Sequence, residues 1–342
     1  MFSFADLRIP LVAAPMAGGP STPALVAAAG AVGGVGFLGG GYLTGDALAG
    51  QLRQARELVR GPFGVNLFVP AQPARTGVDP RVLVYRDELA VEAARYGVEL
   101  PVPDPSDDDH YADKLELLAA EPVAVVSFTF GLPASDAVAR LHGVGTHLAV
   151  TVTDFAEARA AAERGADSLV VQGADAGGHR GTHDASATPN ETPLVELVDE
   201  LHASVDLPIV AAGGVSTAEQ VVTLLAAGAS AVAIGTALLR TPECGTSQAH
   251  KDALASGGYA GTRVTRAFSG RLARALVNRF VLEHDASAPA FYPEVNQLAR
   301  PIRAAAARAG DPDGLSLWAG AGYASARAVG AVEVFRRLSP AG

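Results

Sequence analysis

Cysteine is almost missing from this sequence, since Cys244 is the only one in 342 residues. A single cysteine excludes an intrachain disulfide and a thiolate metal site, and it fits a reducing cytoplasm, which we expect as the location. Basic residues are also in short supply, with 26 Lys and Arg against 36 Asp and Glu and no long basic run. Because binding to a nucleic-acid backbone needs clustered cations, this composition argues against nucleic acid as a partner.

Long apolar runs are missing as well. No stretch of about 18 uninterrupted apolar residues occurs, and the N-terminus lacks a basic region, so we expect neither a membrane span nor a signal peptide. The chain has instead 49% hydrophobic residues, 18% charged residues and 38 glycines. That composition predicts a large globular fold with a sizeable core.

Eight short apolar runs recur along the chain, interleaved with helix-like stretches. Some helices have clear start signals, namely Ser21 or Thr22, Asp154, and a capping box from Ser216 to Glu219. Because most runs do not alternate polar and apolar residues, they predict parallel strands covered on their outer side. The pattern favours a (β/α)8 TIM barrel of class α/β, with an open doubly wound sheet as the alternative. The runs cover residues 10–15, 33–39, 62–69, 123–130, 146–152, 168–173, 207–214 and 230–236.

Two regions do not follow this repeat. Residues 71–121 lie between the third and fourth runs and predict two helices, and an insertion at this end of a barrel is expected to form a lid. Residues 257–342 follow the last run and predict helices near 301–309 and 324–338. We therefore predict a barrel from residues 1–70 and 122–256, and a smaller, mainly helical cap domain from 71–121 and 257–342.

The ends of the predicted strands carry the candidate functional residues, because barrel enzymes place their sites there. Gly213-Gly214 and Gly235-Thr236 end the last two runs, where glycine turns let backbone N–H groups approach a phosphate. Asn66 and Gln172 are amides near strand ends and suit the alternating donors and acceptors of a flavin edge. Either amide could instead serve only a loop backbone.

The stretch GADAGGHRGTHD at 173–184 contains two histidines four residues apart, His179 and His183. That spacing binds zinc when it lies on a helix, but Gly177, Gly178 and Gly181 make a helix unfavourable here, so we predict no metal. His179 follows the sixth strand and is the candidate for proton transfer near neutral pH, while His183 is expected to order the loop.

Several segments together resemble the nitronate monooxygenase family, formerly called 2-nitropropane dioxygenases. They are APMAGG at 14–19, GVNLF at 64–68, QGADAGGHRG at 172–181, AAGGV at 211–215, IGTALLRTPE at 234–243 and LWAGAG at 317–322. The resemblance implies an FMN-dependent barrel that oxidises alkyl nitronates, such as propionate 3-nitronate, with O2 to nitrite and a carbonyl product. Ala233 stands where many members have Gln, and Asp175 stands where Glu is common.

The strand ends and the resemblance together assign the site. His179 falls on the family's active-site histidine, which would hold the nitronate over the flavin and would remove the α-proton of a neutral nitroalkane. The cofactor-binding residues are expected to be Ala14, Pro15, Met16, Asn66, Gln172, Gly177, Gly178, Gly213, Gly214, Ala233, Ile234, Gly235 and Thr236.

Other functions fit the same pattern. The nearest is an FMN-dependent NAD(P)H:quinone reductase or enoyl reductase on the same scaffold, which needs no Rossmann motif. A flavin-free aldolase or isomerase is a weaker alternative, because such enzymes often use a strand-end lysine, whereas Lys114 and Lys251 fall in predicted helices. A non-catalytic FMN sensor is a third. The oligomeric state is open, with a homodimer as one arrangement.

Overall fold

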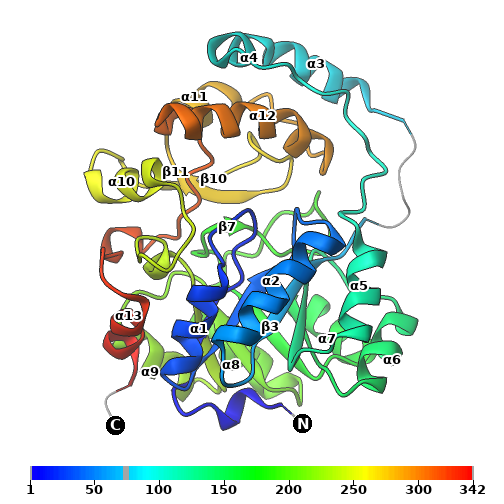
Figure 1. The fold of residues 1–342 in the computed structure, drawn as a ribbon, viewed down its shortest axis with the longest axis vertical. Helices are drawn as coiled ribbons and strands as arrows, with labels where there is room; N and C mark the ends of the chain where they lie inside the picture. Colours follow the sequence, from blue (N-terminus) through cyan, green and yellow to red (C-terminus); the bar gives the residue numbers. More distant parts are fainter. Residues whose placement is uncertain (1, 72–76, 341–342) are drawn as a thin grey trace.

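Eight parallel strands form a closed barrel in the computed structural model, which describes residues 2–71 and 77–340 (Figure 1). The predicted TIM barrel is confirmed, and the open sheet is wrong because the first and last strands pair, with Leu11 opposite Val232. Residues 72–76 of the predicted insertion lie outside the described residues. The strands are β1 (Leu11–Ala13), β2 (Val35–Gly39), β3 (Gly64–Phe68), β4 (Val125–Thr129), β5 (His147–Val152), β6 (Ser168–Gln172), β8 (Ile209–Ala212) and β9 (Ala231–Ile234).

Eight helices surround the barrel. The N-caps at Thr22 and Asp154 accept backbone hydrogen bonds as predicted, but the capping box is formed by Thr217 and Gln220, one residue later than expected. The helices are α1 (Pro23–Ala31), α2 (Gly45–Leu58), α5 (Tyr111–Ala120), α6 (Ser135–Gly143), α7 (Phe155–Arg164), α8 (Leu194–Ser204), α9 (Ala218–Ala226) and α13 (Ala331–Leu338).

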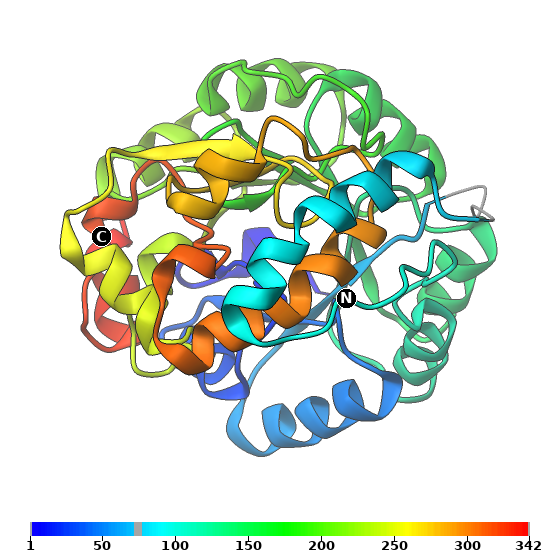
Figure 2. The same cartoon turned by 90° about the horizontal axis from the view of Figure 1, so that it is seen from above.

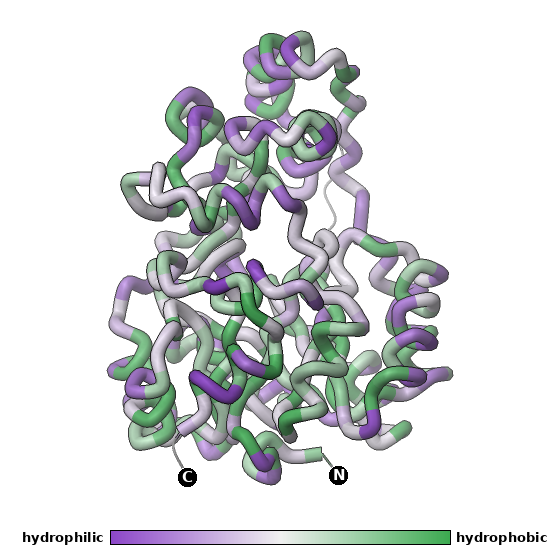
Figure 3. Tube along the Cα trace, turned by 60° about the vertical axis from the view of Figure 1, so that its left-hand side comes forward, coloured by the Kyte–Doolittle hydropathy of each residue, from purple (hydrophilic) through white to green (hydrophobic). Residues whose placement is uncertain are grey.

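The barrel strands are buried on both faces, which explains their continuous apolar sequences. Residues that point inward, such as Val12 and Ala233, form the barrel's own interior. Their neighbours Leu11 and Ile234 point outward and pack in the core beneath the helices. In Figure 3 hydrophobic and hydrophilic stretches alternate along the outer helices, as expected for elements with one face on the core.

A second layer lies above the carboxyl ends of the strands. Seen from above, helices α3, α4 and α12 run across the barrel opening (Figure 2). A three-stranded antiparallel sheet lies beside them and includes β7, a two-residue strand from the histidine loop. This layer consists of α3 (Pro80–Glu88), α4 (Ala90–Tyr96), α10 (Gln248–Ser256), α11 (Arg279–His284), α12 (Glu294–Ala309), β7 (Gly178–His179), β10 (Thr262–Thr265) and β11 (Ala273–Leu276).

The second layer differs in detail from the prediction. The helix expected near 301–309 begins at Glu294, and the helix expected near 324–338 begins at Ala331, after a 3-10 turn at Tyr323–Ser325. Further 3-10 turns lie at Phe4–Asp6, Thr236–Leu238 and Pro312–Gly314.

Two helices that the predicted division placed in the cap domain pack with the barrel. Helix α5 contacts α2 and α6, and α13 contacts α1 and α9. Helix α5 is therefore the third helix of the ring around the barrel in chain order, and α13 is the eighth. The remaining domain bounds stay a prediction.

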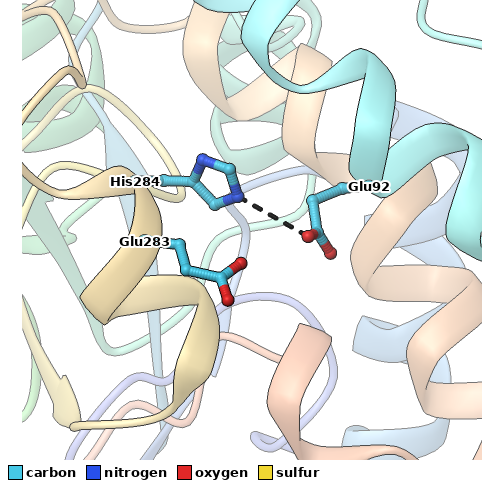
Figure 4. Close-up of side chains that lie close together, drawn as sticks. All are labelled: Glu92, Glu283 and His284. Atoms are coloured by element: carbon cyan, nitrogen blue, oxygen red, sulfur yellow. Dashed lines mark ion pairs between the residues drawn. The ribbon is translucent and has the colours of Figure 1, made fainter.

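Helix α4 is fastened to α11 by a cluster of charged side chains outside the barrel (Figure 4). Arg279 donates to both carboxylate oxygens of the buried Glu92, at 2.6 and 2.7 Å, and also contacts Glu283. His284 Nε2 lies 3.7 Å from Glu92. Because the guanidinium of Arg279 binds oxygens of both carboxylates, we interpret the cluster as an ion-pair network rather than a metal site.

None of the helices within the described residues combines the length and the apolar character that crossing a bilayer requires.

Candidate active site

A cavity of about 680 Å³ opens where the barrel strands end. Thirteen of the fourteen residues predicted for the site line it. They are Ala14, Pro15, Met16, Asn66, Gln172, Gly177, Gly178, His179, Gly213, Gly214, Ala233, Gly235 and Thr236. No described residue of the insertion at 71–121 lines the cavity. Its role as a lid therefore stays a prediction.

Ile234 is the exception among the predicted residues. Its side chain is 1% exposed and packs in the core beneath the helices. Successive strand residues point to opposite faces, so Ala233 faces the barrel interior and Ile234 turns away from it. Its side chain therefore does not reach the cavity, and a contact with the cofactor through its backbone stays a prediction.

The turns after β8 and β9 form one end of the cavity. Gly213 and Gly214 both have left-handed backbones, with φ of 124° and 72°, and a Cβ on Gly214 would lie 2.6 Å from the Cβ of Asp175. No hydrogen-bond acceptor among the described residues takes the N–H of Gly214. Beside it, Thr236 Oγ1 accepts a hydrogen bond of 2.9 Å from the N–H of Gly320. This end has the backbone geometry of an anion site.

A polar floor spans β3, β4 and β5. Asn66 Nδ2 donates to Ser127 Oγ at 2.9 Å and to Thr129 Oγ1 at 3.0 Å, and Thr129 contacts Thr151 at 3.1 Å. No hydrogen bond from the described residues reaches Asn66 Oδ1, so this oxygen is free to accept from a ligand.

Gln172 is more fully engaged than predicted. Its Nε2 donates to the carbonyl of His179 at 3.0 Å, and its Oε1 accepts from the N–H of Gly181 at 2.8 Å. The side chain therefore shapes the histidine loop from the strand below it, which leaves one Nε2 proton and one lone pair of Oε1 for a ligand.

His179 is held in place by the small antiparallel sheet, where it pairs with Ala273. Its Nε2 lies 2.8 Å from Ser269 Oγ, and its ring packs against Phe130 and Trp318 with centroids 5.7 and 5.3 Å away. Burial, reinforced by the charges of Arg271 and Arg303, lowers the pKa of His179 to about 3. The imidazole is therefore neutral throughout the ordinary pH range.

Two guanidiniums supply positive charge beside His179. Arg271 is 5% exposed, lies 4.0 Å over the ring of Phe130, and donates to the carbonyl of Thr182 at 2.9 Å. Arg303 lines the cavity and donates to Asn296 Oδ1 at 2.6 Å. No carboxylate among the described residues forms an ion pair with either arginine. Their charges are therefore available to an anionic ligand.

Tyr42 forms part of the wall between β2 and the cap. Its backbone has a positive φ of 67°, and its N–H donates to Asp109 Oδ1 at 2.7 Å. Asp109 in turn accepts from the buried Lys114 at 2.7 Å. Burial raises the pKa of Tyr42, so its phenol stays protonated beside the two arginines.

The rest of the histidine loop has a supporting role. His183 Nε2 lies 3.0 Å from the carbonyl of Thr151, and its N–H donates to Glu157. Arg180 is 2% exposed and donates to the carbonyls of Gly173 and Asn190. His183 therefore orders the loop as expected, and Arg180 does not line the cavity.

Sequence reasoning missed several residues of the site, namely Tyr42, His250, Ser269, Arg271, Arg303 and Trp318. His250 lines the cavity, is 9% exposed, and its Nε2 has no hydrogen-bond partner among the described residues. The motif-like LWAGAG stretch was a usable signal for Trp318. His250 and Arg303 lie in or beside helices that the sequence predicts, but only the tertiary fold brings these two residues, and Tyr42, Ser269 and Arg271, to the neighbourhood of His179.

Comparison with known proteins gives a consistent result. The family model described as nitronate monooxygenase matches residues 3–339. A probable nitronate monooxygenase of Staphylococcus aureus (strain Newman) is 34% identical over 326 residues, covering 92% of this chain and 89% of that protein. The corresponding protein of Staphylococcus saprophyticus is 34% identical over 321 residues, with the same coverage.

Solved structures share the fold. A crystal structure of nitroalkane oxidase from Streptomyces ansochromogenes superposes with a TM-score of 0.93 at 45% identity, covering 98% of this chain and 96% of that one. FabK from Thermotoga maritima superposes with a TM-score of 0.74 at 22% identity, covering 98% and 93%. The second likeness shows the fold alone.

Proposed function

The chain belongs to the nitronate monooxygenase family, and on that premise we propose that it oxidises alkyl nitronates with O2, using FMN held in the cavity, to nitrite and a carbonyl product. The observation that carries the proposal is a neutral His179 close to two guanidiniums that form no ion pair with a carboxylate in the described part of the chain. A nitronate is an anion, and this surrounding favours an anion over a neutral molecule.

The residues present fit FMN. The N–H of Gly214, which has no acceptor among the residues that the structure describes, and the left-handed glycine backbone around it suit the phosphate. Asn66 Oδ1 suits a donor on the pyrimidine edge of the ring, and Ala14, Pro15 and Met16 provide a largely apolar wall for its face. When bound, FMN supplies the electron transfer that no side chain of the cavity can perform.

The chain's own groups position and neutralise the substrate. Arg271 and Arg303 attract the nitronate, and the neutral imidazole of His179 contacts it from the wall of the cavity. For a neutral nitroalkane, His179 accepts the α-proton. The charges of Arg271 and Arg303 stabilise the nitronate as it forms, but they also disfavour the imidazolium that His179 becomes when it takes the proton. A nitronate needs no proton transfer, so we expect the enzyme to act much better on nitronates than on nitroalkanes.

The test begins with the absorbance spectrum of the purified protein, where we expect the yellow colour of bound flavin. Anaerobic mixing with NADH or NADPH then separates this function from a quinone or enoyl reductase. We expect the yellow colour to persist with both pyridine nucleotides and to bleach with ethyl nitronate. Rapid bleaching by NADPH alone would assign the protein to the reductase class.

Two predictions from the sequence remain to be tested alongside this function. One is the homodimer, which sedimentation of the flavin-loaded protein will measure. The other is the cytoplasmic location, which cell fractionation will measure.

A further inference from the structure

Ser269 is fully buried at 0% exposure and lies at the turn of the β10–β11 hairpin, beside the imidazole of His179. Its Oγ has three neighbours. His179 Nε2 lies at 2.8 Å, the carbonyl oxygen of Arg271 at 3.2 Å and the backbone N–H of Arg271 at 3.4 Å. A hydroxyl carries one proton, so it can donate to only one of the first two.

The carbonyl of Arg271 decides where that proton goes. Among the described residues, no backbone N–H donates to this buried oxygen, and the Ser269 hydroxyl is its one hydrogen-bond donor. A buried carbonyl without a donor costs free energy, whereas a neutral imidazole can donate or accept at the same nitrogen. The hydroxyl proton therefore points to Arg271, and Ser269 Oγ presents a lone pair to His179.

We propose that Ser269 is a positioning residue that holds His179 in the tautomer with the proton on Nε2, so that Nδ1 is the atom that accepts the substrate's proton. No hydrogen bond from the described residues reaches Nδ1, and the side chain lines the cavity. This inference rests on the proposed function for the substrate, but the tautomer itself is a property of the protein alone.

The proton transfer that follows is balanced within the cavity. The α C–H bond of the nitroalkane breaks, and its electron pair stays on the substrate as the nitronate. The proton forms a bond to Nδ1, and His179 becomes an imidazolium that keeps its Nε2–H directed at Ser269. With the opposite tautomer, Nδ1 would already carry a proton and His179 could not take another from the cavity side.

The groups that face His179 bear on its charge rather than on its tautomer. Arg271 comes from the hairpin and Arg303 from α12, and both disfavour the imidazolium. Phe130, Tyr292 and Trp318 surround the ring with centroids between 5.3 and 6.3 Å. Ser269 is the one neighbour with a hydrogen bond to a ring nitrogen among the described residues.

The direct experiment is nitrogen NMR of the flavin-loaded protein labelled with 15N-histidine, at neutral pH and without substrate. The signals of His179 are identified as those missing from a His179→Asn variant. We expect the Nε2 signal of a protonated nitrogen and the Nδ1 signal of an unprotonated one. A protonated Nδ1 in the unaltered protein overturns the proposal, whatever the enzyme's activity.

The kinetic experiment compares nitroethane, which must lose a proton, with ethyl nitronate, which has already lost it. We expect Ser269→Ala to lower turnover of nitroethane by at least about tenfold, within the range of general base catalysis, and to leave turnover of the nitronate within about threefold. Ser269→Thr keeps the hydroxyl and should restore the ratio of the two rates. Ser287→Ala is the matched control, because Ser287 also donates to a backbone carbonyl but lies away from the cavity.

The outcomes separate this inference from the proposed function. If Ser269→Ala lowers both rates equally, the serine has a structural role only and the proposal is wrong. If the NMR shows the expected tautomer while neither substrate is oxidised, the proposed function fails and the tautomer assignment stands.

Discussion

Gly177→Ala is a sharp test of how the cavity is closed. A Cβ on Gly177 would lie 2.4 Å from the backbone nitrogen of Gly320 and 2.6 Å from the carbonyl carbon of Ala319. Both are backbone atoms, so no side chain can rotate away, and the gap falls about 1 Å short of ordinary contact. The histidine loop and the segment at 319–321 must therefore separate.

The magnitude follows from that displacement. Forcing an extra methyl group into a packed contact costs about 1–3 kcal/mol of unfolding free energy. The separation also disturbs the part of the cavity wall that we expect to contact FMN. The N–H of Ala321 donates to the carbonyl of Asp175 at the same place, so this hydrogen bond is disturbed as well. We expect FMN affinity to fall by about tenfold or more, which corresponds to about 1.4 kcal/mol.

The assay measures both quantities on one variant. Urea unfolding gives the stability, and quenching of flavin fluorescence gives the dissociation constant of FMN. Gly97→Ala is the control, because Gly97 has a φ of 62° with nothing within 4 Å of its Cβ, so it loses about 1–2 kcal/mol of stability through backbone strain alone. A Gly177→Ala protein that binds FMN like the unaltered chain would refute the close contact between the two segments.

Three further predictions follow from charges in the structure. Arg271→Met should raise the pKa of His179, because it removes one of the two guanidiniums that lower this pKa. It should also raise the KM for ethyl nitronate by about tenfold, because one positive charge is lost from the site. An unchanged pKa of His179 in an NMR titration would contradict this. His250 has its pKa lowered by burial to about 4, while the unfolded chain titrates at about 6.5, so the unfolded state alone binds this proton between those values. The contribution of His250 to the free energy of unfolding should therefore be fully present above about pH 6.5 and should be lost as the pH falls towards 4. In urea unfolding, His250→Asn should make the free energy of unfolding depend less on pH over this range. Glu92→Gln should lower the unfolding free energy by about 1–3 kcal/mol, because it breaks a buried charged pair with Arg279, whereas Glu283→Gln should change it by less than about 1 kcal/mol.

The barrel was predictable because its strands are buried on both faces. A continuous apolar run needs cover on both faces, which a parallel sheet with helices outside it provides. Every one of the eight runs contains a barrel strand. The errors were local. Ser216 with Glu219 and Thr217 with Gln220 both fit a capping box, and the helix start at Ala218 selects the second pair.

The cavity floor was predictable from the parallel strands, because they bring their carboxyl ends to one edge of the barrel. Ile234 was included because a motif names consecutive residues, whereas a strand turns every second side chain away from the cavity. The small antiparallel sheet was harder to foresee, because β7 has only two residues and its partner β11 lies far along the chain.

That sheet explains why Ser269 and Arg271 were missed. The register between His179 and Ala273 fixes where the hairpin turn lies, and the turn then delivers both residues to the imidazole. No periodicity within 262–276 encodes this contact, because it depends on a pairing between segments some ninety residues apart. Residues that tune a site through tertiary contacts therefore required the structure.

The central claim is that this cavity oxidises a bound nitronate anion beside a neutral histidine. The most direct test follows oxygen uptake and nitrite release by the flavin-loaded protein supplied with propionate 3-nitronate, in parallel with a His179→Asn variant. We predict oxygen uptake with nitrite release in the unaltered protein and a marked loss of both in the variant. Equal rates in the two proteins, or no oxygen uptake with any nitronate, would contradict the account.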